Sequence, residues 1–259
     1  MIERISIEPS RRCSKGCAFC YNGSSAEGEG DWTAGDVVAL ATDAAAHGVA
    51  AISFGGGEPL EWAPIFDALA ALRGVIFRSM TTNGLELDAC IDRLAAARPD
   101  KVHVSIHAPE NPREVERVVR QVRALASFTK SGVNLLVRRS RLDEARDAAR
   151  ALRDAGIDGE RVVYLPMRGP GAETPSPAEI ARVAGTAAFQ SMTCLAACGR
   201  SPRFASIAAD RSVAWCSYTR SRRPLGSLDF ASLVRALGGL EVEPCTSNLV
   251  KLGRRTIPD

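Results

Sequence analysis

The sequence has few lysines, no long hydrophobic run and no strong charge imbalance. Only four of its 33 basic residues are lysines, and 33 basic against 30 acidic residues leave a formal net charge of +3. This balance does not indicate a nucleic-acid groove. No stretch reaches the roughly 18 consecutive apolar residues of a membrane span, and the first residues contain no apolar signal segment. We therefore expect a cytoplasmic protein with no membrane or nucleic-acid partner.

The 259 residues, 46% hydrophobic and 24% charged, suit one large domain or a domain with a small appendage. This composition excludes a disordered tail. In the expected compartment, the eight cysteines are read as metal ligands, redox groups or buried thiols before disulfides.

Short runs rich in valine and isoleucine alternate with amphipathic stretches up to about residue 166. This alternation predicts six βα units around a parallel sheet, an α/β fold. Helix starts with capping-box spacing at Thr33 and Ser176, and a stop at Gly48, support the count. The six strands are predicted at Arg4–Glu8, Ala50–Phe54, Val75–Thr81, Lys101–His107, Val133–Arg138 and Arg161–Leu165.

The βα rhythm ends after a connection rich in proline and glycine, PMRGPGAETPSP, and the helix that follows it. We predict a domain over residues 1–190 and a smaller one over 191–259. The smaller unit is expected to hold strands at Phe204–Ala208 and Val213–Cys216, a turn between them, and a helix over Asp229–Leu237.

Three cysteines, Cys13, Cys17 and Cys20, follow the first strand with C-x3-C-x2-C spacing. Three thiolates on one loop can hold a metal centre, and a centre with only three protein ligands keeps an open position for a substrate or cosubstrate. The alternative is a zinc site closed by a distant cysteine.

Polar and glycine-rich segments follow the later strands. Gly55-Gly56-Gly57-Glu58 follows the second strand, where glycines permit close backbone approach and a carboxylate accepts from an ammonium group. A simple tight turn is the alternative. The carboxyl ends of parallel strands meet at one mouth, so we expect one ligand to be surrounded there. The other strand-end segments are Thr81–Gly84, Ser105–His107, Asn134–Arg138 and Pro166–Gly169.

The cysteine spacing, with aromatic Phe19 before the last cysteine, resembles the radical SAM superfamily. The resemblance implies a partial (βα)6 TIM barrel and a 4Fe-4S cluster on Cys13, Cys17 and Cys20. It also implies that S-adenosylmethionine (SAM) chelates one iron and is cleaved to methionine and a 5′-deoxyadenosyl radical.

The resemblance further implies cofactor-binding roles. Gly56, Gly57 and Glu58 match the segment that binds the methionyl amino group, and Ser105 and Arg117 match positions that meet the ribose and carboxylate. His107 stands where many relatives have aspartate, and a satisfied structural histidine is the preferred interpretation. The expected cofactor-binding residues are Phe19, Gly56, Gly57, Glu58, Thr82, Asn83, Ser105, Arg117 and Asn134.

The remaining cysteines divide into two groups. Cys90 falls in a helical pattern and is expected to be an inert buried thiol. The others suit one fully ligated centre, and their surroundings resemble SPASM or twitch accessory domains, so we predict one auxiliary 4Fe-4S cluster, with zinc as the alternative. These four are Cys194, Cys198, Cys216 and Cys245.

The resemblance implies hydrogen abstraction from an unactivated carbon, with a residue of a ribosomal precursor peptide as the first substrate class. The alternative is oxidation of a small polyol or aminocyclitol, and a structural metal module without catalysis is less favoured. Because the first predicted strand lies close to the start of the sequence, we expect no winged-helix peptide-recognition domain. A flavodoxin or ferredoxin is the expected electron donor, and Arg168 and Tyr218 are candidate substrate contacts. No residue stands out as a catalytic acid or base.

Overall fold

The computed structural model describes residues 2–168, 173–185 and 203–241. Six parallel strands, β1 (Arg4–Ile7), β2 (Ala51–Phe54), β3 (Phe77–Thr82), β4 (Lys101–Ile106), β5 (Lys130–Val137) and β6 (Val162–Pro166), form the barrel wall. Each overlaps its predicted strand, with ends shifted by at most three residues. The predicted α/β fold with a mostly parallel sheet is therefore confirmed, and it is consistent with the predicted partial barrel.

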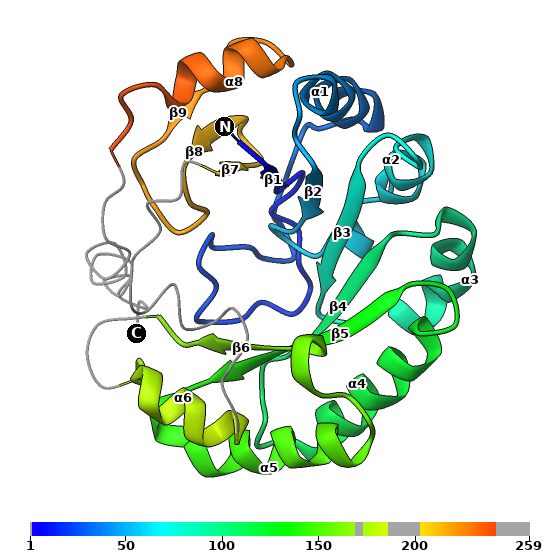
Figure 1. The fold of residues 1–259 in the computed structure, drawn as a ribbon, viewed down its shortest axis with the longest axis vertical. Coiled ribbons are helices and arrows are strands. Elements are labelled where there is room, and N and C mark those ends of the chain that lie inside the picture. Colours follow the sequence, from blue (N-terminus) through cyan, green and yellow to red (C-terminus); the bar gives the residue numbers. More distant parts are fainter. Residues whose placement is uncertain (1, 169–172, 186–202, 242–259) are drawn as a thin grey trace.

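Six helices lie on the convex side of the sheet (Figure 1). They are α1 (Ala34–Ala46), α2 (Ile65–Ala71), α3 (Leu87–Ala97), α4 (Pro112–Leu125), α5 (Leu142–Asp154) and α6 (Pro177–Ala184). Short 3-10 turns, η1 (Pro59–Glu61), η2 (Arg139–Arg141) and η3 (Gly159–Arg161), lie between elements. Both predicted capping boxes are present, at Thr33 and at Ser176.

Alternation of side chains along the strands separates the core from the barrel interior. Ile5, Ile7, Ile52 and Phe54 are fully buried in the core that the helices cover. The intervening positions are polar or small, such as the hydrogen-bonded pair Ser53 and Ser79. Because successive strand side chains point to opposite faces, these positions line the interior and leave space there.

The C-terminal unit extends the barrel sheet. Strand β7 (Phe204–Ile207) pairs in parallel with β1, and β8 (Ser212–Ala214) and β9 (Arg223–Pro224) continue it antiparallel. Helix α8 (Phe230–Leu237) begins at the Asp229 cap and lies beside this end of the sheet (Figure 1). The predicted hairpin and helix are found at their expected positions, but pairing with β1 and strand β9 were not predicted.

The nine-stranded sheet runs β6-β5-β4-β3-β2-β1-β7-β8-β9. In the described ranges no strand pairs β6 with β9, so the sheet stays open along one side. The predicted boundary between residues 190 and 191 lies outside the described residues, and the division into two domains stays a prediction. No helix in the described part has the length and apolar character needed to cross a membrane.

Candidate active site

The cysteine-bearing loop, residues 8–33 between β1 and α1, lies inside the curve of the sheet (Figure 1). Two carboxylates hold it. The backbone N–H and hydroxyl of Ser14 donate to Glu61 Oε1 at 2.9 and 2.8 Å, and Lys15 Nζ pairs with Glu114 Oε1 at 3.0 Å. The loop is thereby fixed between η1 and α4.

Direct backbone contact joins this loop to the glycine-rich turn after β2. Gly57 N–H donates to the Ser10 carbonyl at 2.8 Å and Glu58 N–H donates to the Arg12 carbonyl at 2.7 Å. A Cβ on Gly57 would lie 2.2 Å from the Arg12 carbonyl oxygen, so only glycine fits. The turn therefore has a structural purpose, which is to bring strand β2 against the cysteine loop.

Cys13, Cys17 and Cys20 are free, half-buried and line one cavity of about 340 Å³. In the part of the chain that the structure describes, no three His, Cys, Asp or Glu side chains converge as ligands of a single ion do. An iron-sulfur cluster needs no such convergence, because each thiolate binds a different iron. Three thiolates around one cavity suit an iron-sulfur cluster in which one iron keeps an open position.

Burial raises the pKa of the Cys13 and Cys17 thiols. The nearby charge of Lys15 acts in the opposite direction at Cys17. Asn83 Nδ2 donates to Cys13 Sγ at 3.7 Å. A bound metal centre would supply the positive charge that keeps such thiols deprotonated.

The same cavity collects residues from the ends of all six barrel strands and from the segment after β8. Eight of the nine predicted cofactor-binding residues line it together with the three cysteines. The eight are Phe19, Gly56, Gly57, Glu58, Thr82, Asn83, Ser105 and Asn134. The structure places these residues around one cavity, and their roles in cofactor binding stay predictions.

Glu58 is buried and already heavily engaged. Its carboxylate accepts from the Thr82 hydroxyl at 2.7 Å, from Asn83 N–H at 2.7 Å and from Leu60 N–H at 3.1 Å. Burial raises the pKa of this carboxyl, and these hydrogen bonds lower it. A carboxylate offers about four acceptor positions, so roughly one remains for an ammonium group.

Arg117, the ninth residue, is not on the cavity wall. Its guanidinium donates to the Asn83 carbonyl at 3.2 Å and to Gln121 Oε1 at 2.9 Å. It therefore supports the turn after β3 from behind. Direct contact between Arg117 and a cosubstrate stays a prediction that this placement does not favour.

His107 does line the cavity, facing the Phe19 ring at 5.8 Å. The expectation of a satisfied structural histidine is not met, because Nδ1 is buried and has no hydrogen-bond partner among the described residues. Burial, with the Lys15 charge, lowers the His107 pKa to about 4. The imidazole is thus neutral near pH 7 and presents an unused polar nitrogen. The Arg138 guanidinium lies over the Phe19 ring, with Cζ 4.9 Å from the ring centre.

Beneath this cavity, three polar side chains form a layer across the barrel interior. Asn134 Nδ2 donates to Thr81 Oγ1 at 3.3 Å, and Asn134 Oδ1 lies 2.9 Å from His103 Nδ1. Burial lowers the His103 pKa to about 4, the Asn134 contact opposes this shift, and Lys101 and Arg161 reinforce it.

We expect His103 to stay neutral at pH 6, where an ordinary histidine is mostly protonated. Its pKa is lower in the folded chain than in the unfolded one, so between about pH 6.5 and 4 the unfolded chain binds more protons. Acidification through this window therefore removes stability. NMR titration of the ring, assigned with His103→Gln, tests this, and a midpoint near 6.5 would contradict it.

Arg168 and Tyr218, the predicted substrate contacts, meet at the cavity. Arg168 Cζ lies 4.6 Å from the centre of the Tyr218 ring, and the Tyr218 and Tyr21 rings lie 4.7 Å apart. Arg168 follows β6 and Tyr218 follows β8. These side chains thus connect the two ends of the open sheet beside the cavity.

Sequence reasoning missed the pair formed by buried Glu8 and half-buried Tyr21. The Tyr21 hydroxyl donates to Glu8 Oε1 at 2.9 Å, and Asn22 Nδ2 donates to Glu8 Oε2 at 3.3 Å. Burial raises the pKa of both groups. The only available sequence signal was the position of Tyr21 directly after Cys20. Glu8 could not be recognised, because its partners come from a loop of irregular structure.

Only one of the four predicted auxiliary ligands lies in the described part of the chain. Cys216 is half-buried and accepts from Tyr218 N–H at 3.5 Å, whereas Cys194, Cys198 and Cys245 lie outside the described residues. The auxiliary cluster therefore stays a prediction. Cys90 on α3 is half-buried, less than expected, and burial raises its pKa.

Residues 7–184 match the family model described as the Radical SAM superfamily. A probable GTP 3′,8-cyclase of Methanosarcina mazei is 31% identical over 172 residues, which cover 57% of this chain and 50% of that protein. One from Methanocella arvoryzae is 33% identical over 115 residues, 43% of this chain and 36% of that protein. The chain thus spans half or less of the length of these two relatives.

Solved structures share the fold at lower identity. Streptococcus suis SuiB bound to precursor peptide SuiA aligns with a TM-score of 0.73 at 15% identity, covering 93% of this chain and 66% of that one. At such identity the likeness concerns the fold alone.

Proposed function

The chain belongs to the Radical SAM superfamily, and we propose that it cleaves SAM reductively and abstracts hydrogen from an unactivated carbon of a peptide residue. Membership implies a 4Fe-4S cluster and SAM. The cluster and SAM supply an adenosyl radical, and the protein supplies binding, orientation and exclusion of water. One observation carries the proposal: all three loop cysteines line the same cavity as the strand-end residues.

Each part of the site has a task in this proposal. Cys13, Cys17 and Cys20 hold the cluster, and the contact of Gly57 and Glu58 with the loop fixes it against β2. Glu58 keeps the Thr82–Asn83 turn in place and has about one acceptor position for the SAM amino group. Neutral His107 offers Nδ1 as a further polar contact.

Cavity size favours a peptide side chain as the reacting group. The cavity of about 340 Å³ is at the lower end of the roughly 300–1,000 Å³ that ligand pockets occupy. SAM itself belongs to that size class, so only a small part of a substrate fits beside it. SuiB, which was solved bound to a precursor peptide, shares the fold of this chain.

GTP is the second candidate, because the curated relatives are named GTP 3′,8-cyclases. A triphosphate needs several cations. Within the described residues, the cavity is lined by two cations, Lys15 and Arg168, and Lys15 is paired with Glu114. Charge therefore favours the peptide over GTP. Oxidation of a polyol or aminocyclitol stays a prediction from the sequence alone.

In an oxidation, the substrate loses two electrons and two protons in all. The adenosyl radical takes one hydrogen atom from the substrate carbon, and the substrate radical then releases one electron and one proton. We assign the electron to the auxiliary cluster on the C-terminal cysteines. A flavodoxin or ferredoxin is proposed as the donor for SAM cleavage.

The test uses reduced holoenzyme, SAM, and either a synthetic peptide library or GTP. We expect the library to stimulate 5′-deoxyadenosine formation and to yield peptides lighter by two hydrogens. Arg168→Ala should lower peptide product by about tenfold or more while SAM cleavage without substrate continues, since a lost charged contact costs roughly 1.5–3 kcal/mol. Arg141→Ala, an exposed arginine of η2 that pairs with Glu144, is the control. Stimulation by GTP, with unchanged peptide masses, would overturn the peptide assignment.

A further inference from the structure

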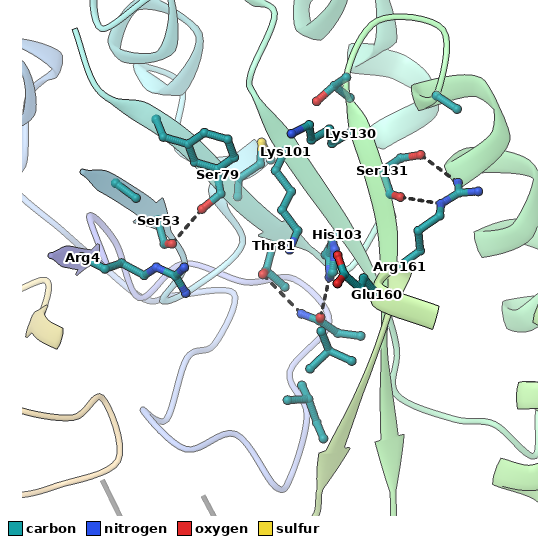
Figure 2. Close-up of a pocket in the computed structure, with 18 residues that line it drawn as sticks. Arg4, Ser53, Ser79, Thr81, Lys101, His103, Lys130, Ser131, Glu160 and Arg161 are labelled. Carbon is teal, nitrogen blue, oxygen red and sulfur yellow. Dashed lines mark hydrogen bonds between the residues drawn. The ribbon is translucent and has the colours of Figure 1, made fainter. Parts of the chain in front are cut away.

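A second cavity, of about 700 Å³, opens at the opposite end of the barrel (Figure 2). It is lined by the first residues of five strands: Arg4, Ala51, Phe77, Lys101 and Lys130. The layer of Thr81, Asn134 and His103 lines it from inside, and Thr81 and Asn134 also line the cysteine cavity. The two cavities thus lie on opposite sides of that layer.

Four cations surround this amino-terminal cavity: Arg4, Lys101, Lys130 and Arg161. Two of the four lysines of the whole chain are among them. Glu160 is the one acidic residue among the lining residues that the structure describes. The described lining residues therefore carry a net charge of about +3, which equals the formal charge of the whole chain.

Among the described residues, these cations form no close ion pairs. Of the ion pairs formed between described residues, none involves any of the four within 4.0 Å. Arg161 is held by neutral acceptors, the Ser131 carbonyl at 3.0 Å and the Gly156 carbonyl at 3.0 Å. These contacts fix the orientation of the Arg161 guanidinium without an ion pair to any described residue.

The sheet register places like charges side by side. Lys101 of β4 is the direct neighbour of Lys130 of β5, a pairing that costs stability in the absence of an anion. Figure 2 shows Lys101 extending into the cavity, with Arg4 and Arg161 on opposite sides. Burial lowers the Lys101 pKa, the charges of Arg4 and Lys130 lower it further, and the Glu160 charge acts in the opposite direction.

We propose that this amino-terminal cavity binds a small polyphosphate-type anion, at a site separate from the cysteine cavity. Arginine matches phosphate oxygens in a bidentate manner and lysine acts as a point charge. Hydroxyls of Ser53 and Ser79 lie on the same wall. A volume of about 700 Å³ suits a small molecule.

The test titrates inorganic tripolyphosphate into the reconstituted holoenzyme by calorimetry, with saturating SAM present. We expect binding of one ion per chain that weakens as salt increases, because salt screens charges. Lys101→Gln combined with Lys130→Gln should weaken it by about tenfold or more, since contacts with ionised groups contribute roughly 1.5–3 kcal/mol. Citrate, a carboxylate polyanion, should bind more weakly and separates the phosphate class from carboxylates.

The control is Arg113→Gln combined with Arg182→Gln, which removes two exposed charges from α4 and α6 and should leave tripolyphosphate affinity unchanged. As a second readout, saturating tripolyphosphate should raise the His103 pKa from about 4. Equal affinity of the lysine variant and wild type, displacement of the ion by SAM, or an unmoved His103 titration would overturn the proposal. Tighter binding of citrate than of tripolyphosphate would overturn the assignment to phosphate and indicate a carboxylate ligand.

Discussion

Replacing Cys13, Cys17 and Cys20 together by alanine removes about four irons per chain and abolishes 5′-deoxyadenosine formation. The three thiols line one cavity beside the β2 turn, and the other two described cysteines, Cys90 and Cys216, do not line it. Loss of a residue that only hydrogen-bonds to a metal ligand lowers metal affinity or activity by about 10–100-fold. We therefore expect the ligand variant to lose at least about 100-fold in 5′-deoxyadenosine formation, measured with anaerobic iron and sulfide quantification.

Cys90→Ala is the matched control, because Cys90 is half-buried on α3, outside the cavity. It should retain wild-type iron and activity. With an auxiliary cluster, iron should fall from about eight to about four per chain. A fall from about four to none would keep the radical enzyme but remove the auxiliary cluster, and unchanged iron in the triple variant would contradict the assignment of these cysteines.

Gly57→Ala should strongly destabilise the folded chain and impair cluster incorporation. The new Cβ would lie 2.2 Å from the Arg12 carbonyl oxygen, and this neighbour is backbone, which cannot rotate away. Overpacking of this kind costs about 1–3 kcal/mol, which corresponds to a fall of roughly 2–12 °C in Tm for a chain of this size. Thermal unfolding followed by circular dichroism measures the effect.

Gly55→Ala provides the comparison within the same turn. A Cβ on Gly55 meets nothing within 4 Å, so its Tm should stay within about 2 °C of wild type. Equal Tm values for the two variants would show that contact between the turn and the cysteine loop does not stabilise the site.

Local patterns were sufficient to predict the barrel. Alternating apolar residues and capping boxes lie within single elements, so the six strands and the caps at Thr33 and Ser176 follow from the sequence. Grouping of the strand-end residues follows as well, because parallel strands place their carboxyl ends at one edge. Thr82, Asn83, Ser105 and Asn134 all reach the same cavity.

Features that depend on side-chain partners were not predictable. Arg117 lies behind the β3 turn because Gln121 and the Asn83 carbonyl bind it there. His107 Nδ1 is buried without a partner, which only three-dimensional packing determines. Pairing of β7 with β1 joins segments about 200 residues apart, and the amino-terminal cavity depends on the register of Lys101 beside Lys130.

The most direct test of the central claim is 5′-deoxyadenosine formation by the anaerobically reconstituted wild-type chain, with SAM and dithionite. We expect 5′-deoxyadenosine and methionine in equal amounts, and no product when dithionite is omitted. A fully loaded, reduced sample that leaves SAM intact would contradict the claim that this cavity carries out radical SAM chemistry.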